Sequence, residues 1–483
     1  MDIINIILII LIFLGRGKRH NRKGDHTKSV IPKLKLELFR MKKEGKENTA
    51  EYKELIKRIE STEHQDRAKK AEIRRKKEQE KEEMYVKSDK TGMKFFEFIR
   101  KASRRPEHVD ALRLNGEIRH DKEGMKEAAR EEFRSRFEGA NKAPKKDRRP
   151  PMNDGNLDKE VNKELTREEF DMYLKDLKKG RSGGIDGIKN ELLKGSGAKT
   201  KDLLFIFIRN IFRTGYIPED LNTGRVKLIF KSGDHLEPGN YRPITVSSVL
   251  IKLFTKIYGA RLSKVLEDNN VLEDNQIGFR PGRGTADAIL MINTIINKYK
   301  NKKKPLHIAF LDLTKAYDRV NREVMFEKLT EAGLGGRTRQ IIQNLYYKDK
   351  ILIELNGELC SKIFLTKGLK QGCGLSPTLF NFMAKEIARE VEKIDNSICL
   401  GNRRINAIFY ADDLVVMASS RVKLKEKLDV IESTGGTFGM EINRKKSKRL
   451  ELDDLEVLME EREAEEQMDM ERVEQFKYLG KNI

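Results

Sequence analysis

Tryptophan is absent from the 483 residues of this chain, and cysteine occurs only three times, as Cys360, Cys373 and Cys399. No pair of these cysteines has the short spacing of a zinc knuckle, and an odd, scattered set does not form a disulfide framework. We therefore expect neither a disulfide-stapled secreted domain nor a structural zinc centre. The cysteine usage favours a reducing compartment.

Long apolar runs are also missing. The most apolar stretch, residues 3–14, has twelve positions, whereas a helix that crosses a bilayer needs about 20 apolar residues. Met1-Asp2 stands before this stretch in place of a cationic segment, and no small-residue cleavage site follows it, so a signal peptide is disfavoured. We predict no stable membrane span and interpret residues 1–15 as an apolar N-terminal extension.

Positive charge, by contrast, is abundant. The chain carries 99 Lys and Arg against 77 Asp and Glu, a formal net charge of +22, and 36% of its residues are charged. This balance makes a polyanion the expected partner. A hydrophobic share of 38% still allows a sizeable core, and the length predicts roughly two to four structural units.

The positive charge is concentrated in the first third of the chain. Residues 1–150 hold 42 Lys and Arg against 27 Asp and Glu, and the spacing of Tyr52 and Leu55 predicts helix. We interpret residues 16–150 as a basic, largely helical arm or linker that ends near Pro150-Pro151. Two functions remain open for it, namely binding of a phosphate backbone or a solvated spacer of mixed charge.

After residue 151 the pattern is typical of a folded domain with both helices and strands. Residues 225–230 and 306–311 are predicted strands, and Asn356-Gly357 predicts a hairpin turn. Ser248 and Thr285 are predicted helix N-caps, because each hydroxyl precedes a run with apolar residues at helical spacing. No internal repeat is present.

Adjacent carboxylates are the most informative feature. Asp412 and Asp413 lie between apolar runs at 408–410 and 414–417, which predicts a hairpin with both acids at its turn, and their mutual repulsion calls for a cation. Carboxylate oxygens suit Mg²⁺. If the strand that ends before Asp312 is a neighbour of this hairpin, three carboxylates converge on a site for two-metal phosphoryl transfer. The alternative is that the paired acids serve turn chemistry alone.

Three segments around these acids carry a family resemblance. They are YADD at 410–413, FLDLTKAYD at 310–318 and GLKQGCGLSP at 368–377. Together they resemble the palm of a reverse transcriptase of the LINE-type, non-LTR retrotransposons. Further blocks follow the family's order over roughly residues 165–483: GGIDG at 183–187, LIFK at 228–231, NYRPI at 240–244, GFRPGRGT at 278–285, GMEINRKKS at 439–447 and YLG at 478–480. Intron maturases and telomerases share the palm, but GFRPGRGT favours the LINE-type branch.

The resemblance implies an α+β fold of the right-hand polymerase type. It predicts fingers at 151–305 and a palm with an antiparallel sheet at 306–483, preceded by the basic helical arm, with the thumb absent. The implied function is an RNA-directed DNA polymerase that adds dNTPs to a primer 3′-hydroxyl. The alternative is a truncated, non-catalytic nucleic-acid-binding remnant of such an element, since no endonuclease or thumb is recognised.

The resemblance also implies roles for individual residues. Asp312, Asp412 and Asp413, with the backbone carbonyl of Leu313, would hold two Mg²⁺ ions, with Mn²⁺ as an alternative. The remaining site residues would contact the nucleotide: Lys231 and Arg242 the triphosphate, Gln371 and Gly372 the base pair, Lys446 the leaving pyrophosphate, and Tyr317 the sugar. A simpler interpretation remains open for each of these residues. It is ordinary salt bridging for Lys231 and Arg242, an exposed loop for Gln371 and Gly372, a solvated charge run for Lys446, and a packed core aromatic for Tyr317.

Tyr317 indicates the substrate. By resemblance, a bulky aromatic five positions after Asp312 occupies the space of a ribose 2′-hydroxyl, so a deoxynucleoside triphosphate is predicted. The other implied partners are an RNA template and a DNA primer or target, and the implied location is nucleus and cytoplasm.

The chain departs from the family pattern at a few positions. Lys370 and Gly374 stand where the family usually has Arg and Pro, and Leu221 stands where a tryptophan is common. Residues 451–471 hold eleven acids and one basic residue, Arg462, which predicts an acidic, helix-like insert before the return strand. We expect these departures to alter loop rigidity more than metal binding.

Overall fold

The computed structural model describes residues 109–138 and 155–483, apart from Ser232, Lys348, 395–397 and 453–458, together with isolated positions between 41 and 58. The chain divides into two compact units, of which residues 16–108 form one and residues 109–483 with 1–15 form the other. The predicted extension at 1–15 and most of the predicted arm at 16–150 lie outside the described residues. Within the arm, Tyr52 and Leu55 are helical, as their spacing predicts.

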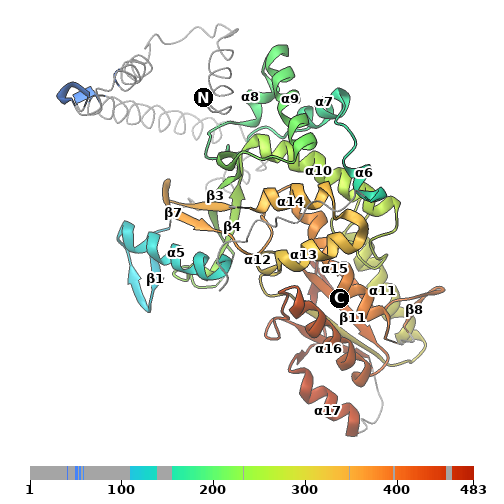
Figure 1. Ribbon diagram of the computed structural model, residues 1–483. Helices are drawn as coiled ribbons and strands as arrows, with labels where there is room; N and C mark the ends of the chain where they lie inside the picture. The colour runs from blue at the N-terminus through green and yellow to red at the C-terminus, as the bar shows by residue number, and fades with distance from the viewer. Residues whose placement is uncertain are drawn as a thin grey trace, which may run out of the picture. The chain divides into compact units, whose positions relative to one another are not determined.

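A four-stranded sheet forms the first half of the folded unit (Figure 1). Its strands are β3 (Thr223–Phe230), β4 (Tyr241–Val246), β6 (Lys350–Leu355) and β7 (Glu358–Phe364), in the order β4-β3-β6-β7. β3 and β4 are antiparallel, as are β6 and β7, whereas β6 runs parallel to β3. The predicted turn at Asn356-Gly357 connects β6 to β7, and both of its residues have positive φ.

This sheet crosses the predicted boundary between 151–305 and 306–483. Parallel pairing of β6 with β3 requires a long crossover, and more than a hundred residues, β5 (Leu306–Asp312) of the other sheet among them, separate the two strands in the chain. The chain therefore leaves the first sheet, forms part of the second, and returns. Sequence spacing did not predict this return, because register between distant strands depends on tertiary packing.

A small module covers one face of the four-stranded sheet. It consists of the hairpin β1 (Leu112–Leu114) and β2 (Glu117–Arg119) and the helix α5 (Lys122–Phe137). Met125 and Phe133 of α5 pack in one hydrophobic cluster with Val226 and Ile353 of the sheet. Residues 109–138, which we predicted as part of the arm, are thus folded onto this sheet. The apolar stripe of α5 escaped prediction because charged residues surround it.

Helices pack beside this sheet, and most of them belong to one hydrophobic cluster. They are α6 (Asn156–Val161), α7 (Arg167–Lys175), α8 (Asn190–Lys194), α9 (Ala198–Thr214), α10 (Val249–Asp268), α13 (Arg322–Leu329) and α14 (Arg337–Tyr346). Short helical turns also occur, namely η1 (Glu219–Asn222), η2 (Pro238–Asn240), α12 (Ala316–Arg319) and η3 (Thr330–Leu334). The Ser248 hydroxyl accepts a hydrogen bond from the Leu250 N–H, so this predicted N-cap is confirmed.

A five-stranded sheet forms the second half. Its strands are β10 (Ala407–Tyr410), β11 (Asp413–Ala418), β5, β12 (Lys448–Leu452) and β13 (Glu471–Arg472), in the order β10-β11-β5-β12-β13. All neighbours are antiparallel except β12 and β13. The helices α11 (Thr285–Asn301), α15 (Ser376–Glu392) and α16 (Arg421–Thr437) pack with it, and Figure 1 shows α15 and α16 close to β11.

One predicted cap in this half was wrong. Gly284, not Thr285, is the N-cap of α11, and the Asp287 carboxylate accepts a hydrogen bond from the Gly284 N–H. Thr285 becomes the first helical residue because Asp287 already satisfies the backbone N–H at the cap. An acid at the third helical position that bonds back to the N-cap N–H makes one of the two contacts of a capping box.

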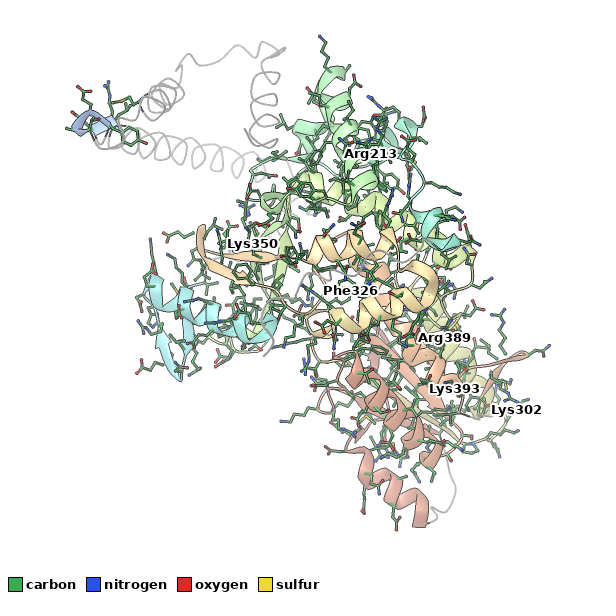
Figure 2. All side chains as sticks on the ribbon, viewed as in Figure 1. Arg213, Lys302, Phe326, Lys350, Arg389 and Lys393 are labelled. Atoms are coloured by element: carbon green, nitrogen blue, oxygen red, sulfur yellow. The ribbon has the colours of Figure 1, made fainter. Side chains whose placement is uncertain are left out.

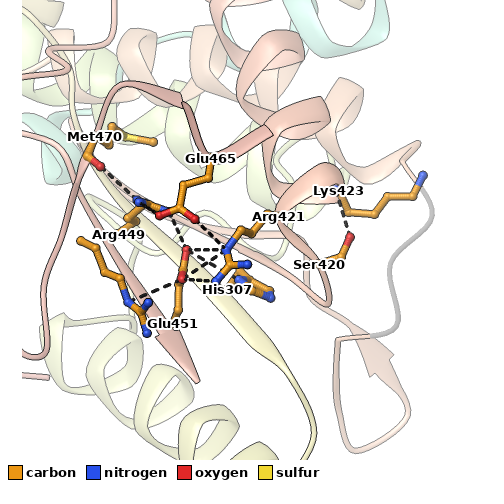
Figure 3. A network of polar contacts seen from close by, with 9 residues as sticks. His307, Ser420, Arg421, Lys423, Arg449, Glu451, Glu465 and Met470 are labelled. Atoms are coloured by element: carbon orange, nitrogen blue, oxygen red, sulfur yellow. Dashed lines mark hydrogen bonds and ion pairs between the residues drawn. The ribbon is translucent and has the colours of Figure 1, made fainter. Parts of the chain in front are cut away.

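Residues 459–468 of the predicted acidic insert form the helix α17 (Met459–Met468), as the composition predicts, whereas residues 451–452 belong to β12 and Glu471 begins β13. Figure 3 shows how it is tied to the sheet: Glu465 of α17 forms ion pairs with Arg449 and Arg421. After α17 the chain returns as β13, parallel to β12. The remaining strands form two short hairpins, β8 (Cys399–Leu400) with β9 (Arg403–Arg404) and β14 (Lys477–Tyr478) with β15 (Lys481–Asn482).

Basic side chains occur on both halves of this unit. Figure 2 labels Arg213 near the end of α9, Lys350 at the start of β6 and Lys393 just after α15. Among the described helices, none combines the length and apolar character that a membrane crossing requires.

Candidate functional site

The structure brings the three predicted carboxylates together. Asp413 is the first residue of β11 and lies directly opposite Asp312, the last residue of β5, in the antiparallel register. Directly opposed residues of this kind have Cα atoms about 4.5–5.5 Å apart. Asp412 precedes Asp413 in the two-residue turn from β10, where Ala411 has a φ of 57°. Two neighbouring acids at the β10–β11 turn and one acid from a distant strand thus lie together at the ends of adjacent strands.

The three carboxylates form an anionic site whose negative charge is not fully neutralised by the neighbouring residues. Burial, together with the negative charges of Asp412 and Asp312, raises the pKa of Asp413 to about 6, while the positive charge of Lys231 opposes the change. Carboxylates that repel each other in this way favour a bound cation. Oxygen donors suit Mg²⁺ or Mn²⁺, so the residues present fit such an ion. Among the described residues, no group of three or more acidic, His or Cys side chains is placed so that it could hold a metal ion as it stands.

A second segment holds Asp312 in place. The Asp312 N–H donates to the Ser447 hydroxyl at 3.2 Å, and the Asn443 N–H donates to the Asp312 carbonyl at 2.8 Å. Ile442 forms a bridge to Leu313. The exposed Lys446 lies in this turn, where its N–H donates to the Asn443 carbonyl at 3.1 Å. Lys446, the predicted proton donor, therefore belongs to the segment that fixes Asp312. The contact of Ser447 with Asp312 was not predicted from the sequence.

Tyr317 lies in an aromatic stack beside the carboxylates. Its ring lies parallel to Phe380 of α15 with 4.6 Å between centroids, and Phe279 meets it edge-on at 6.4 Å. Burial and the charge of Asp412 raise the pKa of the Tyr317 phenol. Its buried hydroxyl has no hydrogen-bond partner among the described residues. Phe380 was not predicted, although its place in the apolar run after Pro377 was the signal.

The loop of Gln371 and Gly372 is fixed against β4. The Thr245 N–H donates to the Gln371 carbonyl at 3.2 Å. Gly372 has a φ of 98°, and a Cβ there would lie 2.8 Å from the Thr245 carbonyl oxygen. The preceding Lys370 is buried, with its ammonium 2.9 Å from Asp349. This loop is therefore an anchored one, and only glycine fits its tightest point.

The two predicted phosphate contacts lie at the loop end of the β3–β4 hairpin. Lys231 follows β3, and its N–H donates to the Asn240 carbonyl at 3.0 Å. Its positive charge lowers the pKa of Asp413, so it acts on the carboxylate site. Arg242 is exposed on β4, directly opposite Ile229. The hairpin thus presents one cation toward the acids and another to solvent.

Comparison with known proteins assigns this arrangement to a family. A family model described as "Reverse transcriptase (RNA-dependent DNA polymerase)" matches residues 229–483, which is more than half of the chain. The chain belongs to the reverse transcriptase family. All ten predicted site residues of this reverse transcriptase lie inside the matched region.

The similar proteins are retrotransposon polymerases. The chain is 28% identical to the Pol polyproteins of the type-1 retrotransposable element R2 from Bradysia coprophila, over 56% of this chain and 30% of that protein, and from Popillia japonica, over 59% and 39%. It is 24% identical to the RNA-directed DNA polymerase of the mobile element jockey from Drosophila funebris, over 58% and 31%. The predicted LINE-type resemblance is confirmed. The chain spans about a third of the length of these relatives.

Among solved structures, a telomerase from Candida tropicalis truncated from its C-terminal domain is 16% identical, with a TM-score of 0.38, over 55% of this chain and 54% of that one. A telomerase from Candida albicans is 12% identical, with a TM-score of 0.34, over 48% and 43%.

Proposed function

We propose that this reverse transcriptase is an RNA-directed DNA polymerase core that adds deoxynucleotides to a primer 3′-hydroxyl. The observation that carries the proposal is the register of β5 and β11, which sets Asp312 opposite Asp413 and beside Asp412. Family membership and the retrotransposon polymerases similar to it support the same reaction. An RNA template, a DNA primer or target and dNTPs are the proposed partners, and nucleus and cytoplasm the proposed location.

Asp312, Asp412, Asp413 and the Leu313 carbonyl would hold two Mg²⁺ ions, or Mn²⁺ in their place. When bound, such ions stabilise the charge that develops on the reacting phosphate. The protein's own contribution is geometric, because Ser447 and Asn443 fix the backbone of Asp312 while the strand register fixes Asp413. Preorganisation of this kind keeps the reacting groups aligned.

The remaining residues would bind the nucleotide and direct protons. Lys231 and Arg242 would hold the triphosphate, Arg242 through its forked guanidinium. The Gln371–Gly372 loop would lie against the new base pair, and Lys446 would donate a proton to the leaving pyrophosphate. Tyr317, supported by Phe380, would occupy the space of a ribose 2′-hydroxyl and so select dNTPs.

We also propose a revised domain division. The four-stranded sheet with its covering module, residues 109–138, and the helices around it form the fingers. The five-stranded sheet with α11, α15 and α16 forms the palm, and β6 and β7 belong to the fingers despite their position after β5. This division follows the hydrogen-bonded sheets and not the single boundary near residue 305.

Primer extension tests the proposal. On a poly(rA) template with an oligo(dT) primer, the chain should incorporate dTTP only when Mg²⁺ or Mn²⁺ is present. Asp412→Asn should reduce incorporation about a thousandfold, because loss of a metal ligand removes several kcal/mol of transition-state stabilisation. Asp429→Asn, which changes an exposed acid of α16, is the matched control and should keep full activity.

Two outcomes would contradict the assignment. Incorporation that survives Asp412→Asn would remove the proposed site. Salt-dependent RNA binding without any metal-dependent incorporation would instead support a non-catalytic nucleic-acid-binding protein.

A further inference from the structure

A buried carboxylate next to Tyr317 connects the nucleotide loop to a helix far upstream. Asp318 is 2% exposed, and its Oδ1 accepts a hydrogen bond from Gln371 Nε2 at 2.8 Å. Its Oδ2 lies 3.7 Å from Nη1 of Arg136, and both side chains are almost fully buried. Arg136 belongs to α5, outside the region 229–483 that the family model matches.

Arg136 also contacts the hairpin that carries the two proposed phosphate-binding residues. Its Nη2 donates to the Gly239 carbonyl at 3.3 Å and its Nη1 to the Tyr241 carbonyl at 3.5 Å. Glu132, one turn earlier on α5, pairs with Arg136 at 2.5 Å and with Lys315 at 3.1 Å. One guanidinium therefore joins the β3–β4 hairpin, the segment of Tyr317 and the loop of Gln371.

The hydrogen bond from Gln371 to Asp318 determines which way the Gln371 amide faces. Because a carboxylate only accepts hydrogen bonds, the NH₂ group must face Asp318, and the amide oxygen is left for a ligand. This orientation requires Asp318 to stay in place as a buried anion, which is costly without a partner cation. Arg136 supplies that cation from α5.

We propose that Arg136 is a positioning residue of the nucleotide site, which acts through Asp318 to set the orientation of Gln371 and to hold the β3–β4 hairpin next to it. The proposal rests on the polymerase function proposed above. If Arg136 has this role, the module at 109–138 is part of the nucleotide-binding site. The predicted consequence is a specific loss of nucleotide affinity when the ion pair is broken.

Steady-state dTTP incorporation with poly(rA) and oligo(dT) tests this role. Arg136→Met, which removes the charge and keeps the length, should raise KM for dTTP about 10- to 100-fold, because leaving a buried charge unpaired costs a few kcal/mol. Its kcat should change less than threefold. Arg136→Lys should recover part of the affinity. Arg134→Met is the matched control, since Arg134 is an exposed residue of the same helix that pairs with Glu138, and it should match the wild type.

A second substitution separates positioning from general damage. In Arg136→Met/Asp318→Asn, no unpaired charge remains and the Asn oxygen still accepts from Gln371, so KM should return to within about threefold of the wild type. If Arg136→Met folds and keeps the wild-type KM, the positioning role is overturned. If Arg136→Met fails to fold, Arg136→Lys decides: a KM above that of the wild type supports the role, and a wild-type KM overturns it. A wild-type chain that incorporates no dTTP would instead overturn the polymerase function itself, and the positioning role with it.

Discussion

At the scale of single residues, the site depends on side chains that hold other side chains. Tyr317 is held by Phe380 beneath its ring, and Asp312 by the Ser447 hydroxyl at its backbone. Lys370 is held by a buried cluster with Asp349. These supporting contacts come from elements distant in the chain, so each can be tested separately from the residue it supports.

Replacing Tyr317 should change the selectivity between ribonucleotides and deoxyribonucleotides. Tyr317→Ala removes the ring that would occupy the space of the 2′-hydroxyl, so we expect kcat/KM for UTP relative to dTTP to rise by about tenfold or more, which corresponds to roughly 1.4 kcal/mol. Tyr216→Ala, at a tyrosine that is 66% exposed, is the control and should leave the ratio unchanged. An unchanged ratio in Tyr317→Ala would show that the ring is only a packed core aromatic.

The buried cluster around Asp349 should matter for stability. The Asp349 carboxylate lies 3.2 Å from Arg322 and 2.9 Å from Lys370, and all three side chains are 3% exposed or less. Asp349→Ala leaves two buried cations without their anion, so the free energy of unfolding should fall by about 3–5 kcal/mol. Urea denaturation measures this loss. Asp429→Ala, at an exposed acid, should change it by less than about 0.5 kcal/mol.

At the scale of elements, the packing of α5 and α17 was hard to predict from the sequence, for a different reason in each case. The apolar stripe of α5 is hidden among charges, yet Phe133 is fully buried against the four-stranded sheet. The helix α17 is acidic, yet arginines of β12 and α16 hold it to the palm sheet. Both elements are placed by contacts that bring together segments separated in sequence.

Loss of packing at α5 should destabilise the fingers. Phe133→Ala creates a cavity between α5 and the sheet, and we expect it to lower the free energy of unfolding by about 3–5 kcal/mol. Denaturant unfolding of the full chain measures the effect. Ser135→Ala changes an exposed neighbour on the same helix and is the control. If Phe133→Ala and Ser135→Ala were equally stable, α5 would not be part of the folded core.

The network around Glu451 should make the palm sensitive to acid (Figure 3). Burial opposes ionisation of Glu451, but hydrogen bonds from His307 and Arg421 and the charge of Arg449 lower its pKa well below the usual range. A carboxyl whose pKa is lowered on folding stabilises the protein at a pH above its unfolded pKa of about 4.3. That stabilisation is lost as the pH falls below this value toward the folded pKa.

Urea midpoints between pH 7 and pH 3 test this dependence. In the wild type the midpoint should fall as the pH drops below about 4.3. Glu451→Gln should lower the midpoint at pH 7 and flatten the dependence on pH. Glu426→Gln, at an exposed position of α16, should reproduce the wild-type curve. A wild-type curve that stays level down to pH 3 would contradict the lowered pKa.

At the scale of the whole molecule, the excess of positive charge should govern nucleic-acid affinity. With a net charge of +22, RNA binding should release counterions, so the logarithm of the affinity should fall linearly with the logarithm of the salt concentration. Binding of a single-stranded RNA measured from 50 to 200 mM salt should weaken more than about tenfold. Affinity that is independent of salt would show that the basic residues do not contact the phosphates.

The sequence by itself was sufficient to predict the family and the fold class. The family assignment, the α+β class and the hairpin of Asp412 and Asp413 were all predictable, because they depend on short patterns of residue type: alternation, turn dipeptides and motifs in a set order. The roles of all ten predicted site residues stay predictions, although the charge of Lys231 acts on the pKa of Asp413 and Lys446 lies in the turn that fixes Asp312. Such local patterns can be recognised in a segment without knowing where that segment lies in the fold.

Only the tertiary structure decided which segments meet. The pairing of Asp312 with Asp413, the return of β6 to β3, and the contact between Arg136 and Asp318 join residues about 100, 130 and 180 positions apart. No local pattern encodes such a contact, since strand register and helix docking are determined by burial of apolar faces across the whole core. For this reason α5 was predicted as part of a basic arm or linker, whereas its packed face places Arg136 beside Asp318, which binds the Gln371 side chain.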